Sequence, residues 1–92
     1  MNLFKNHIST LSDIELIQAY QNENAQKFIG QLFSRYAHLV FGVSLKYLKS
    51  EAEAKDLTQD VYTVIQKKLK THEVTNFSSW PHQLTKNECL IK

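Results

Sequence analysis

The sequence of 92 residues has one cysteine, one proline and two glycines, and each shortage excludes a class of structure. The single cysteine, Cys89, rules out a disulfide within the chain and leaves no pair of thiolates for a metal site. So few glycines and prolines leave few of the breaks that hairpins and small sheets need. Long helices are the expected outcome, and we predict an all-α fold, a compact bundle of about four helices.

Several functional patterns are also missing. No basic segment followed by an apolar one opens the chain, and no apolar run reaches the roughly 18 residues that a membrane span needs. The sequence contains no nucleophile–base pair, no glycine-rich phosphate loop and no metal-ligand spacing, and its four histidines share no motif. We therefore predict a cytoplasmic protein that is not an enzyme and that has no membrane segment, cofactor, bound metal or small-molecule substrate.

A chain of this length forms one small domain that buries about 60% of the surface its unfolded form exposes. Residues 1–11 show no sustained apolar period and are predicted to be an N-terminal arm, followed by one helical domain over residues 12–92. The net charge is +2, but it is unevenly spread. From Lys67 onward five lysines face two glutamates, whereas the first 66 residues carry six basic and seven acidic side chains. Any electrostatic footprint for phosphates is therefore expected near the C-terminal end.

Local signals predict where the helices lie. The segments Ser12–Glu15 and Ser50–Glu53 both have the capping-box form that starts a helix, and the second is expected to extend from Glu51 to about Lys70. Between residues 25 and 48 the spacing of apolar residues predicts one continuous core helix, with the stripe Phe28, Leu32, Tyr36, Leu39, Val40, Val43 and Tyr47. Residues 72–76 are expected to form a loop, and a last helix is expected to start near Ser78.

The two glycines both fall inside the predicted helix over residues 25–48. Glycine in a helix interior costs roughly 1 kcal/mol relative to alanine. We therefore expect a neighbouring helix to approach closely at Gly30 and Gly42.

The predicted helix over residues 51–70 has two unlike faces. At about 100° per residue, its apolar face carries Leu57, Val61, Val64, Ile65 and Leu69, and its polar face carries Asp56, Gln59, Asp60, Thr63 and Lys67. Periodicity alone leaves two explanations for the polar face, a solvated surface or a binding surface.

Four blocks of the sequence resemble one protein family. Residues 54–62 look like the acidic "D-L-x-Q-D/E-x-aromatic" segment of region 2.2 in bacterial sigma factors of the sigma-70 family, in particular the extracytoplasmic-function (ECF) class. Residues 32–48 resemble the region 2.1 helix, and residues 13–20 resemble the first helix of ECF proteins. Residues 77–87 are similar to the family's last region 2 helix, although Pro81, Gln83 and Glu88 depart from the usual pattern.

This resemblance implies a sigma-70 region 2-like (sigma-2) helical domain that binds core RNA polymerase and recognises and melts the promoter minus-ten element in transcription initiation. Asp56, Gln59 and Asp60, flanked by Tyr62 and Thr63, would meet the basic clamp helices of the polymerase β′ subunit. Acidic side chains three and four residues apart present a row that arginine forks engage well. An anti-sigma factor is a further expected partner.

The resemblance also implies where promoter DNA binds. In the family, the loop before the last helix accepts a flipped base of the non-template strand, and stacking and phosphate-binding groups suit that task. The expected DNA-binding residues are His72, Asn76, Phe77, Trp80, Lys86 and Asn87. Asn76, Lys86 and Asn87 are predicted to contact DNA, while Phe77 and Trp80 are predicted to support the loop.

Family members normally continue into region 4, whose helix-turn-helix reads the minus-thirty-five element. We expect this chain to be a fragment that lacks region 4, or else a natural short protein that competes for polymerase. Pro81, Gln83 and the modest charge favour a second function, a sigma-like module that binds polymerase or an anti-sigma factor without productive DNA recognition.

Overall fold

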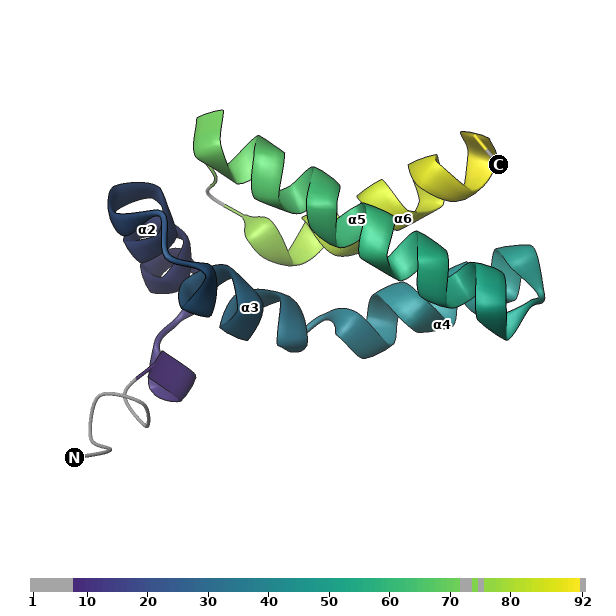
Figure 1. Cartoon of the computed structure of the whole chain (residues 1–92), viewed down its shortest axis with the longest axis horizontal. Coiled ribbons are helices and arrows are strands. Elements are labelled where there is room, and N and C mark those ends of the chain that lie inside the picture. The colour runs from purple at the N-terminus through teal and green to yellow at the C-terminus, as the bar shows by residue number, and fades with distance from the viewer. Residues whose placement is uncertain (1–7, 72–73, 75, 92) are drawn as a thin grey trace.

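The computed structural model describes residues 8–71, 74 and 76–91, and for residue 91 it describes only the backbone. Every regular element in this part of the chain is a helix, which confirms the predicted all-α class (Figure 1). Residues 8–10 are helical. The further elements are α2 (Asp13–Glu23), α3 (Gln26–Ser34), α4 (Ala37–Leu48), α5 (Glu51–Thr71), the short 3-10 helix η1 (Phe77–Ser79) and α6 (Trp80–Ile91).

The helices form two groups that share α5. Helices α4, α5 and α6 pack against one another, and α2 packs against α3 and also contacts α5. In Figure 1, α2 and α3 occupy one end of the molecule and α6 lies behind α5. Helix α5 therefore contributes to both groups and is the central element of the fold.

Serine side chains cap the start of two helices at the predicted positions, and at α2 the predicted capping box is complete. At α2 the Glu15 backbone N–H donates to Ser12 Oγ at 3.2 Å, and the Ser12 backbone N–H donates to Glu15 Oε1 at 2.8 Å. At α5 the Glu53 backbone N–H donates to Ser50 Oγ at 3.3 Å. Acidic residues in the first turn of α5 and lysines in its last turn complement the helix dipole at both ends. These local signals explain why both starts are predictable from sequence.

The core is built around the apolar face of α5. Leu57, Val61, Ile65 and Leu69 are all completely buried, as the helical spacing predicts. They pack with buried residues from α2, α3 and α4, chiefly Leu16, Ile17, Tyr20, Ile29, Leu32 and Val40. Burying each of these large apolar side chains stabilises the fold by roughly 2 kcal/mol.

The predicted continuous helix over residues 25–48 is wrong, because the chain breaks at Arg35 and Tyr36. The backbone tightens there, with N–H groups of both residues donating to carbonyls three residues back, Arg35 to Leu32 at 3.2 Å and Tyr36 to Phe33 at 2.9 Å. Neither glycine nor proline causes this break. The side chains of Arg35 and Tyr36 both reach α2, which lets α3 pack on α2 while α4 packs on α5 and α6.

After the break, α4 no longer buries the whole apolar stripe predicted for it. Val40 is completely buried, but Leu39 is 41% exposed and Tyr47 is 46% exposed. The expected close approach at Gly42 is also wrong, because a Cβ there would meet nothing within 4 Å. At Gly30 a Cβ would lie 3.9 Å from its nearest neighbour, the hydroxyl of Tyr62 on α5, which is an ordinary packing distance.

Among the residues that the structure describes, two polar side chains are buried in the packed helices. Ser44 and Thr85 are completely buried, and each hydroxyl donates to the carbonyl four residues earlier in its own helix, at 2.7 Å to Val40 and at 2.5 Å to Pro81. Cys89 is also buried, and this burial raises the pKa of its thiol. Within the described residues, no helix combines the length and the apolar character needed to cross a membrane.

Candidate functional site

The acidic row predicted on α5 lies on the outer face of that helix. Asp56, Gln59, Asp60 and Thr63 are all exposed, while the opposite face of the helix is buried. The Thr63 hydroxyl donates to the Gln59 carbonyl at 3.1 Å, so it is held along the helix. Three of these side chains, Asp56, Gln59 and Asp60, therefore form a continuous row on the surface of a rigid element.

Tyr62 lies apart from that row. Its ring is half-buried and stacks on Phe33 of α3 with ring centroids 4.7 Å apart. Its hydroxyl donates to Gln26 Oε1 at 3.5 Å, and Gln66 Nε2 donates to the same oxygen at 2.8 Å. Burial, followed by the nearby Tyr20, raises the pKa of Tyr62. The position of Tyr62 suits a packing role between α5 and α3.

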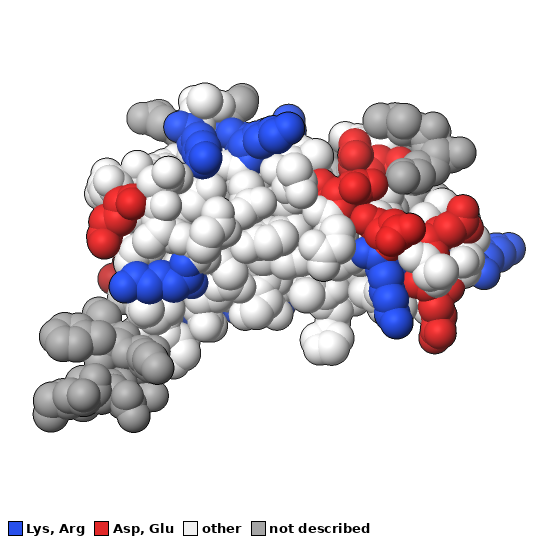
Figure 2. Space-filling view, in the orientation of Figure 1, with Lys and Arg blue, Asp and Glu red and all other residues white. Residues whose placement is uncertain are grey.

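The charges of α5 are separated along its length. In its first half Glu51, Glu53, Asp56 and Asp60 are exposed together with one lysine, Lys55, so this half is net acidic. Lys67, Lys68 and Lys70 are exposed near its end. Figure 2 shows the same division, with acidic side chains gathered where α5 begins and lysines gathered where it ends. The exposed face of this one helix can therefore attract opposite charges at its two ends.

The predicted promoter segment begins in the structure with Asn76 and η1. Asn76 is exposed, and its Oδ1 accepts from the Ser78 hydroxyl at 2.9 Å. The Ser79 hydroxyl donates to the Asn76 carbonyl at 3.1 Å. A 3-10 turn thus precedes α6. The sequence predicts that Ser78 starts the last helix, but in the structure Ser78 lies within this turn and its hydroxyl bonds back to Asn76. His72, the other residue predicted in this loop, lies outside the described residues.

Phe77 and Trp80 fix the start of α6 by packing. Phe77 is only 2% exposed, and its ring lies 5.8 Å from that of half-buried Trp80. The Trp80 backbone N–H donates to the Phe77 carbonyl. In this conformation the Phe77 ring is packed inside the protein and is not open to stacking by a base.

Lys86 and Asn87 are both exposed on α6. They share the outward face of that helix with Gln83 and with Leu90, which is 69% exposed. Because α5 and α6 pack against each other with their apolar faces, their exposed faces point away from the shared interface. The described members of the two predicted sets come from different elements, α5 for the first set and the segment from Asn76 through α6 for the second.

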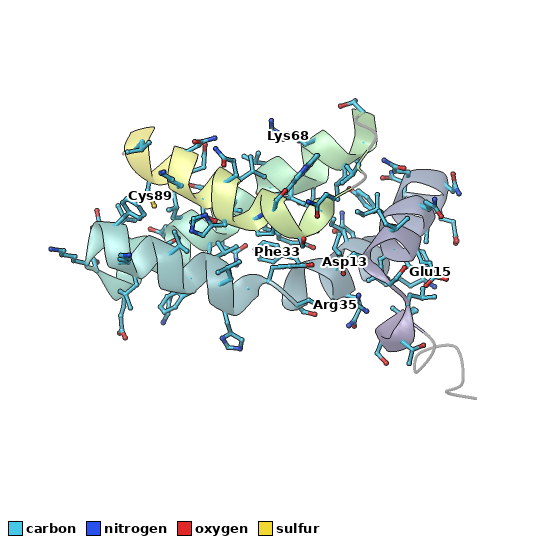
Figure 3. The ribbon with its side chains drawn as sticks, turned by 180° about the vertical axis from the view of Figure 1, so that it is seen from behind. Asp13, Glu15, Phe33, Arg35, Lys68 and Cys89 are labelled. Carbon is cyan, nitrogen blue, oxygen red and sulfur yellow. The ribbon has the colours of Figure 1, made fainter. Side chains whose placement is uncertain are left out.

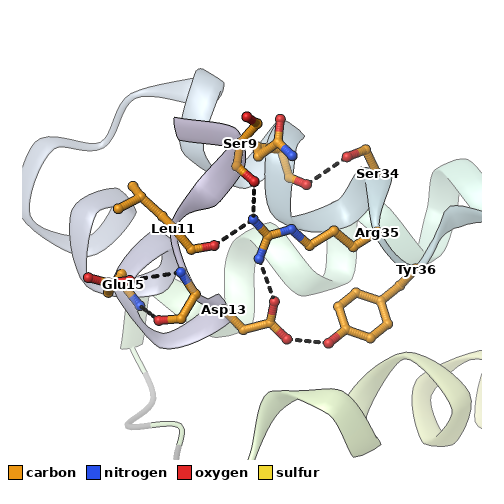
Figure 4. Close-up of polar contacts among 9 residues, drawn as sticks. Ser9, Leu11, Asp13, Glu15, Ser34, Arg35 and Tyr36 are labelled. Carbon is orange, nitrogen blue, oxygen red and sulfur yellow. Dashed lines mark hydrogen bonds and ion pairs between the residues drawn. The ribbon is translucent and has the colours of Figure 1, made fainter. Parts of the chain in front are cut away.

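Sequence reasoning misses one polar cluster, which joins α2 to the break between α3 and α4. Arg35 Nη1 pairs with Asp13 Oδ1 at 3.0 Å, and Asp13 Oδ2 accepts a hydrogen bond from the Tyr36 hydroxyl (Figure 4). Figure 3 labels Asp13 and Arg35 close together, and Cys89 near the opposite end of the molecule. Burial and the bond to Asp13 raise the pKa of Tyr36 to about 12. One signal could have drawn attention to this cluster, since Arg35 is the single arginine of the chain.

The described residues contain no group of three or more histidine, cysteine, aspartate or glutamate side chains placed to hold a metal ion. Exposed features within the described residues include the row on α5 and the surface formed by Asn76 and α6. Both are convex helical surfaces suited to binding a macromolecule.

Comparison with known proteins identifies the family. The family model described as "Sigma-70 region 2" matches residues 32–91, which is more than half of the chain. The chain belongs to the sigma-70 region 2 family. This match covers the end of α3 and all of α4, α5, η1 and α6, so both candidate surfaces lie within it. No curated protein and no solved structure matches the chain.

Membership assigns a general role to the domain. Region 2 belongs to non-enzymatic transcription initiation factors and takes part in binding core RNA polymerase and in promoter recognition.

Proposed function

We propose that this sigma-70 region 2 domain belongs to an ECF sigma factor, and that it binds the β′ clamp helices of core RNA polymerase through the outer face of α5. The observation that carries this proposal is the exposed row of Asp56, Gln59 and Asp60 within the residues matched by the family model. Side chains three and four residues apart on one rigid helix present carboxylates that arginine forks can engage together. The ECF class is supported by the resemblance of α2, which lies outside the matched residues.

The second part of the proposal concerns promoter DNA. Asn76, Lys86 and Asn87 contact the non-template strand of the minus-ten element and help to melt it, while Phe77 and Trp80 hold this surface in place. Exposure of the first three residues and packing of the last two support this division. His72 would join the first group, and an anti-sigma factor would compete for the α5 row.

The polymerase contact is tested by a binding titration against the β′ clamp-helix fragment. Asp60→Lys reverses one charge of the row and should weaken binding at least about tenfold, because a repelled charge replaces an attracted one. Glu23→Lys makes the same change of net charge on exposed α2 and should bind like the wild type. Both variants should keep their unfolding free energy within about 0.5 kcal/mol, as exposed substitutions do. Equal binding by Asp60→Lys and the wild type would contradict the assignment.

The DNA contact is tested with a single-stranded oligonucleotide selected by the wild type from a randomised pool. Asn76→Ala and Lys86→Ala should each weaken this complex while leaving the affinity for the clamp-helix fragment unchanged. Normal DNA binding by both variants would contradict the proposed DNA surface.

A second candidate function is a polymerase-binding or anti-sigma-binding module without productive DNA recognition. The composition of α6 favours this alternative, because few positive charges are available there for phosphates. The exposed face of the helix has Gln83 and a single lysine, Lys86, and Glu88 follows two residues after that lysine. Tight binding to the clamp helices, combined with failure to select any oligonucleotide, would support this alternative.

A further inference from the structure

The polar cluster of Asp13, Arg35 and Tyr36 ties the start of α2 to the junction of α3 and α4. Arg35 Nη2 donates to the carbonyls of Ser9 at 3.2 Å and Leu11 at 2.5 Å, while Nη1 pairs with Asp13 at 3.0 Å (Figure 4). The second oxygen of Asp13 accepts from the Tyr36 hydroxyl. Asp13 and Arg35 have side chains that are only 25% and 27% exposed, so solvent weakens their interaction less than at an open surface. The position of the Tyr36 ring is therefore fixed from two sides, by its backbone and by Asp13.

The Tyr36 ring in turn contacts the segment that opens the last helix. It packs against the Phe77 ring in a T-shaped arrangement, with ring centroids 5.4 Å apart and an interplanar angle of 73°. Phe77 then packs on Trp80. A chain of direct contacts thus connects Asp13 to Tyr36, Phe77 and Trp80, across residues from three separate parts of the sequence.

Side-chain packing is important for holding the segment formed by Asn76 and η1 in place. Asn76 has an irregular backbone conformation, with φ −137° and ψ 78°, and its side chain makes no capping bond to η1. Helix η1 is a single 3-10 turn, whose hydrogen bonds are less favourable than those of an α-helix. Hydrogen bonds from the Ser78 and Ser79 hydroxyls to Asn76 are internal to this segment. The buried Phe77 ring anchors the segment to the rest of the fold, and Tyr36 is one of its packing partners.

We propose that Asp13 and Tyr36 are positioning residues for the promoter-contacting surface. Their hydrogen bond holds the Tyr36 ring in place, and Phe77 packs against this ring. The position of Phe77 in turn sets the orientation of residues 76–80. The family model match begins at residue 32, so Asp13 lies outside it. The expected consequence rests on the proposed function: loss of this hydrogen bond impairs DNA binding and leaves polymerase binding intact. The exposed row on α5 makes none of these contacts.

The structural part of the proposal can be tested without DNA. Tyr36→Phe keeps the ring and removes the hydroxyl, and the readout is hydrogen exchange of the Trp80 backbone amide, which is bonded to the Phe77 carbonyl. We expect this amide to exchange about tenfold faster in the variant. A tenfold change corresponds to about 1.4 kcal/mol, which is the order of the free energy lost with one hydrogen bond to a charged acceptor. Asp13→Asn should produce an acceleration in the same direction.

Two controls separate positioning from a general loss of stability. The buried amide of Val61 in α5 reports global opening, and it should accelerate less than that of Trp80. Tyr62→Phe removes another half-buried tyrosine hydroxyl that bonds a side chain, but its ring stacks on Phe33 and not on Phe77. It should leave Trp80 exchange as in the wild type. Unchanged Trp80 exchange in Tyr36→Phe, or an acceleration no larger than that of Val61, would overturn the proposal.

The functional part uses the oligonucleotide selected by the wild-type chain and the clamp-helix fragment. Tyr36→Phe should weaken the oligonucleotide complex about tenfold and leave the clamp-helix complex unchanged, whereas Tyr62→Phe should leave the oligonucleotide complex unchanged. Equal DNA affinity of Tyr36→Phe and the wild type would overturn the positioning role even if Trp80 exchange changes. Failure of the wild type to select any oligonucleotide would overturn the proposed DNA function itself, and the exchange experiment would still decide whether Asp13 and Tyr36 position the segment.

Discussion

Tyr36 gives the domain a specific response to alkaline pH. Burial first, and then the hydrogen bond to Asp13, raise its pKa from 10.0 to about 12, so the folded state favours the neutral phenol. Below pH 10 the phenol is neutral in both states and its stabilising contribution is complete. As the pH rises from 10 towards 12, the unfolded chain loses this proton first, so the free energy of unfolding must fall.

Urea denaturation across this alkaline range measures the effect. Tyr36→Phe has no phenol at this position, so its free energy of unfolding should fall less steeply with pH than that of the wild type. Tyr62 also has a raised pKa and remains in the variant, so part of the dependence should persist. Identical slopes for the two proteins would show that Tyr36 ionises equally in the folded and unfolded states.

Tyr20 presents the opposite situation to Tyr36. It is only 1% exposed, and its hydroxyl has no hydrogen-bond partner among the described residues. Tyr20→Phe keeps the ring in the core and removes a polar group whose desolvation is uncompensated. We expect the free energy of unfolding to stay unchanged or to rise by about 1 kcal/mol in chemical denaturation. A loss of comparable size would mean that the hydroxyl has a partner in solution.

At the scale of single elements, α4 carries a glycine with no structural reason for being there. Gly42 lies in the interior of the helix, its φ is not positive, and an added Cβ would meet nothing within 4 Å. Gly42→Ala should therefore raise the free energy of unfolding by about 0.5–1 kcal/mol, because alanine loses less backbone entropy in a helix. Thermal or urea unfolding would measure this gain.

Gly30→Ala in α3 is the matched control for this substitution. Its Cβ would lie 3.9 Å from the Tyr62 hydroxyl, an ordinary contact distance, so a gain of similar sign is expected. Destabilisation by Gly42→Ala alone would show that something covers that face of α4 in solution.

The helices differ in how well the sequence predicts them, and the difference follows the range of the interactions. The starts of α2 and α5 depend on a serine hydroxyl that accepts from the backbone N–H three residues later, so a local pattern suffices. The break between α3 and α4 depends on Arg35 and Tyr36 reaching Asp13, more than 20 residues away. Periodicity continues through this break, so it predicts one helix where the fold has two.

The same distinction applies to the candidate site. The exposed row of Asp56, Gln59 and Asp60 follows directly from helical spacing, since the buried face of α5 fixes the other face. Sequence proximity groups Tyr62 with this row, although its angle around the helix turns it towards Phe33. Contacts between side chains of different elements, such as Tyr36 with Phe77, cannot be predicted without the tertiary structure. The two residues are far apart in the sequence, and the packing of the helices between them brings them together.

At the scale of the whole molecule, ionic strength should decide how the charge division along α5 affects a bound partner. The acidic and basic ends of the helix should both act on the partner at low salt, and only the nearer end should act on it at high salt. Asp60 and Lys70 are ten residues apart on one helix, a rise of about 15 Å. The Debye length is about 8 Å at 0.15 M salt and about 30 Å at 0.01 M. At physiological salt the lysines are therefore screened from a partner bound at the acidic end, whereas at low salt they act on it.

Two matched double variants test this expectation against the basic clamp-helix fragment. Asp56→Asn with Asp60→Asn removes two attracting charges and should lower affinity at both salt concentrations and weaken its salt dependence. Lys67→Gln with Lys70→Gln removes two repelling charges and should raise affinity at about 0.01 M while leaving it unchanged at about 0.15 M. Loss of affinity in the lysine variant at either salt concentration would contradict the proposed orientation, because it would place the partner at the basic end of α5.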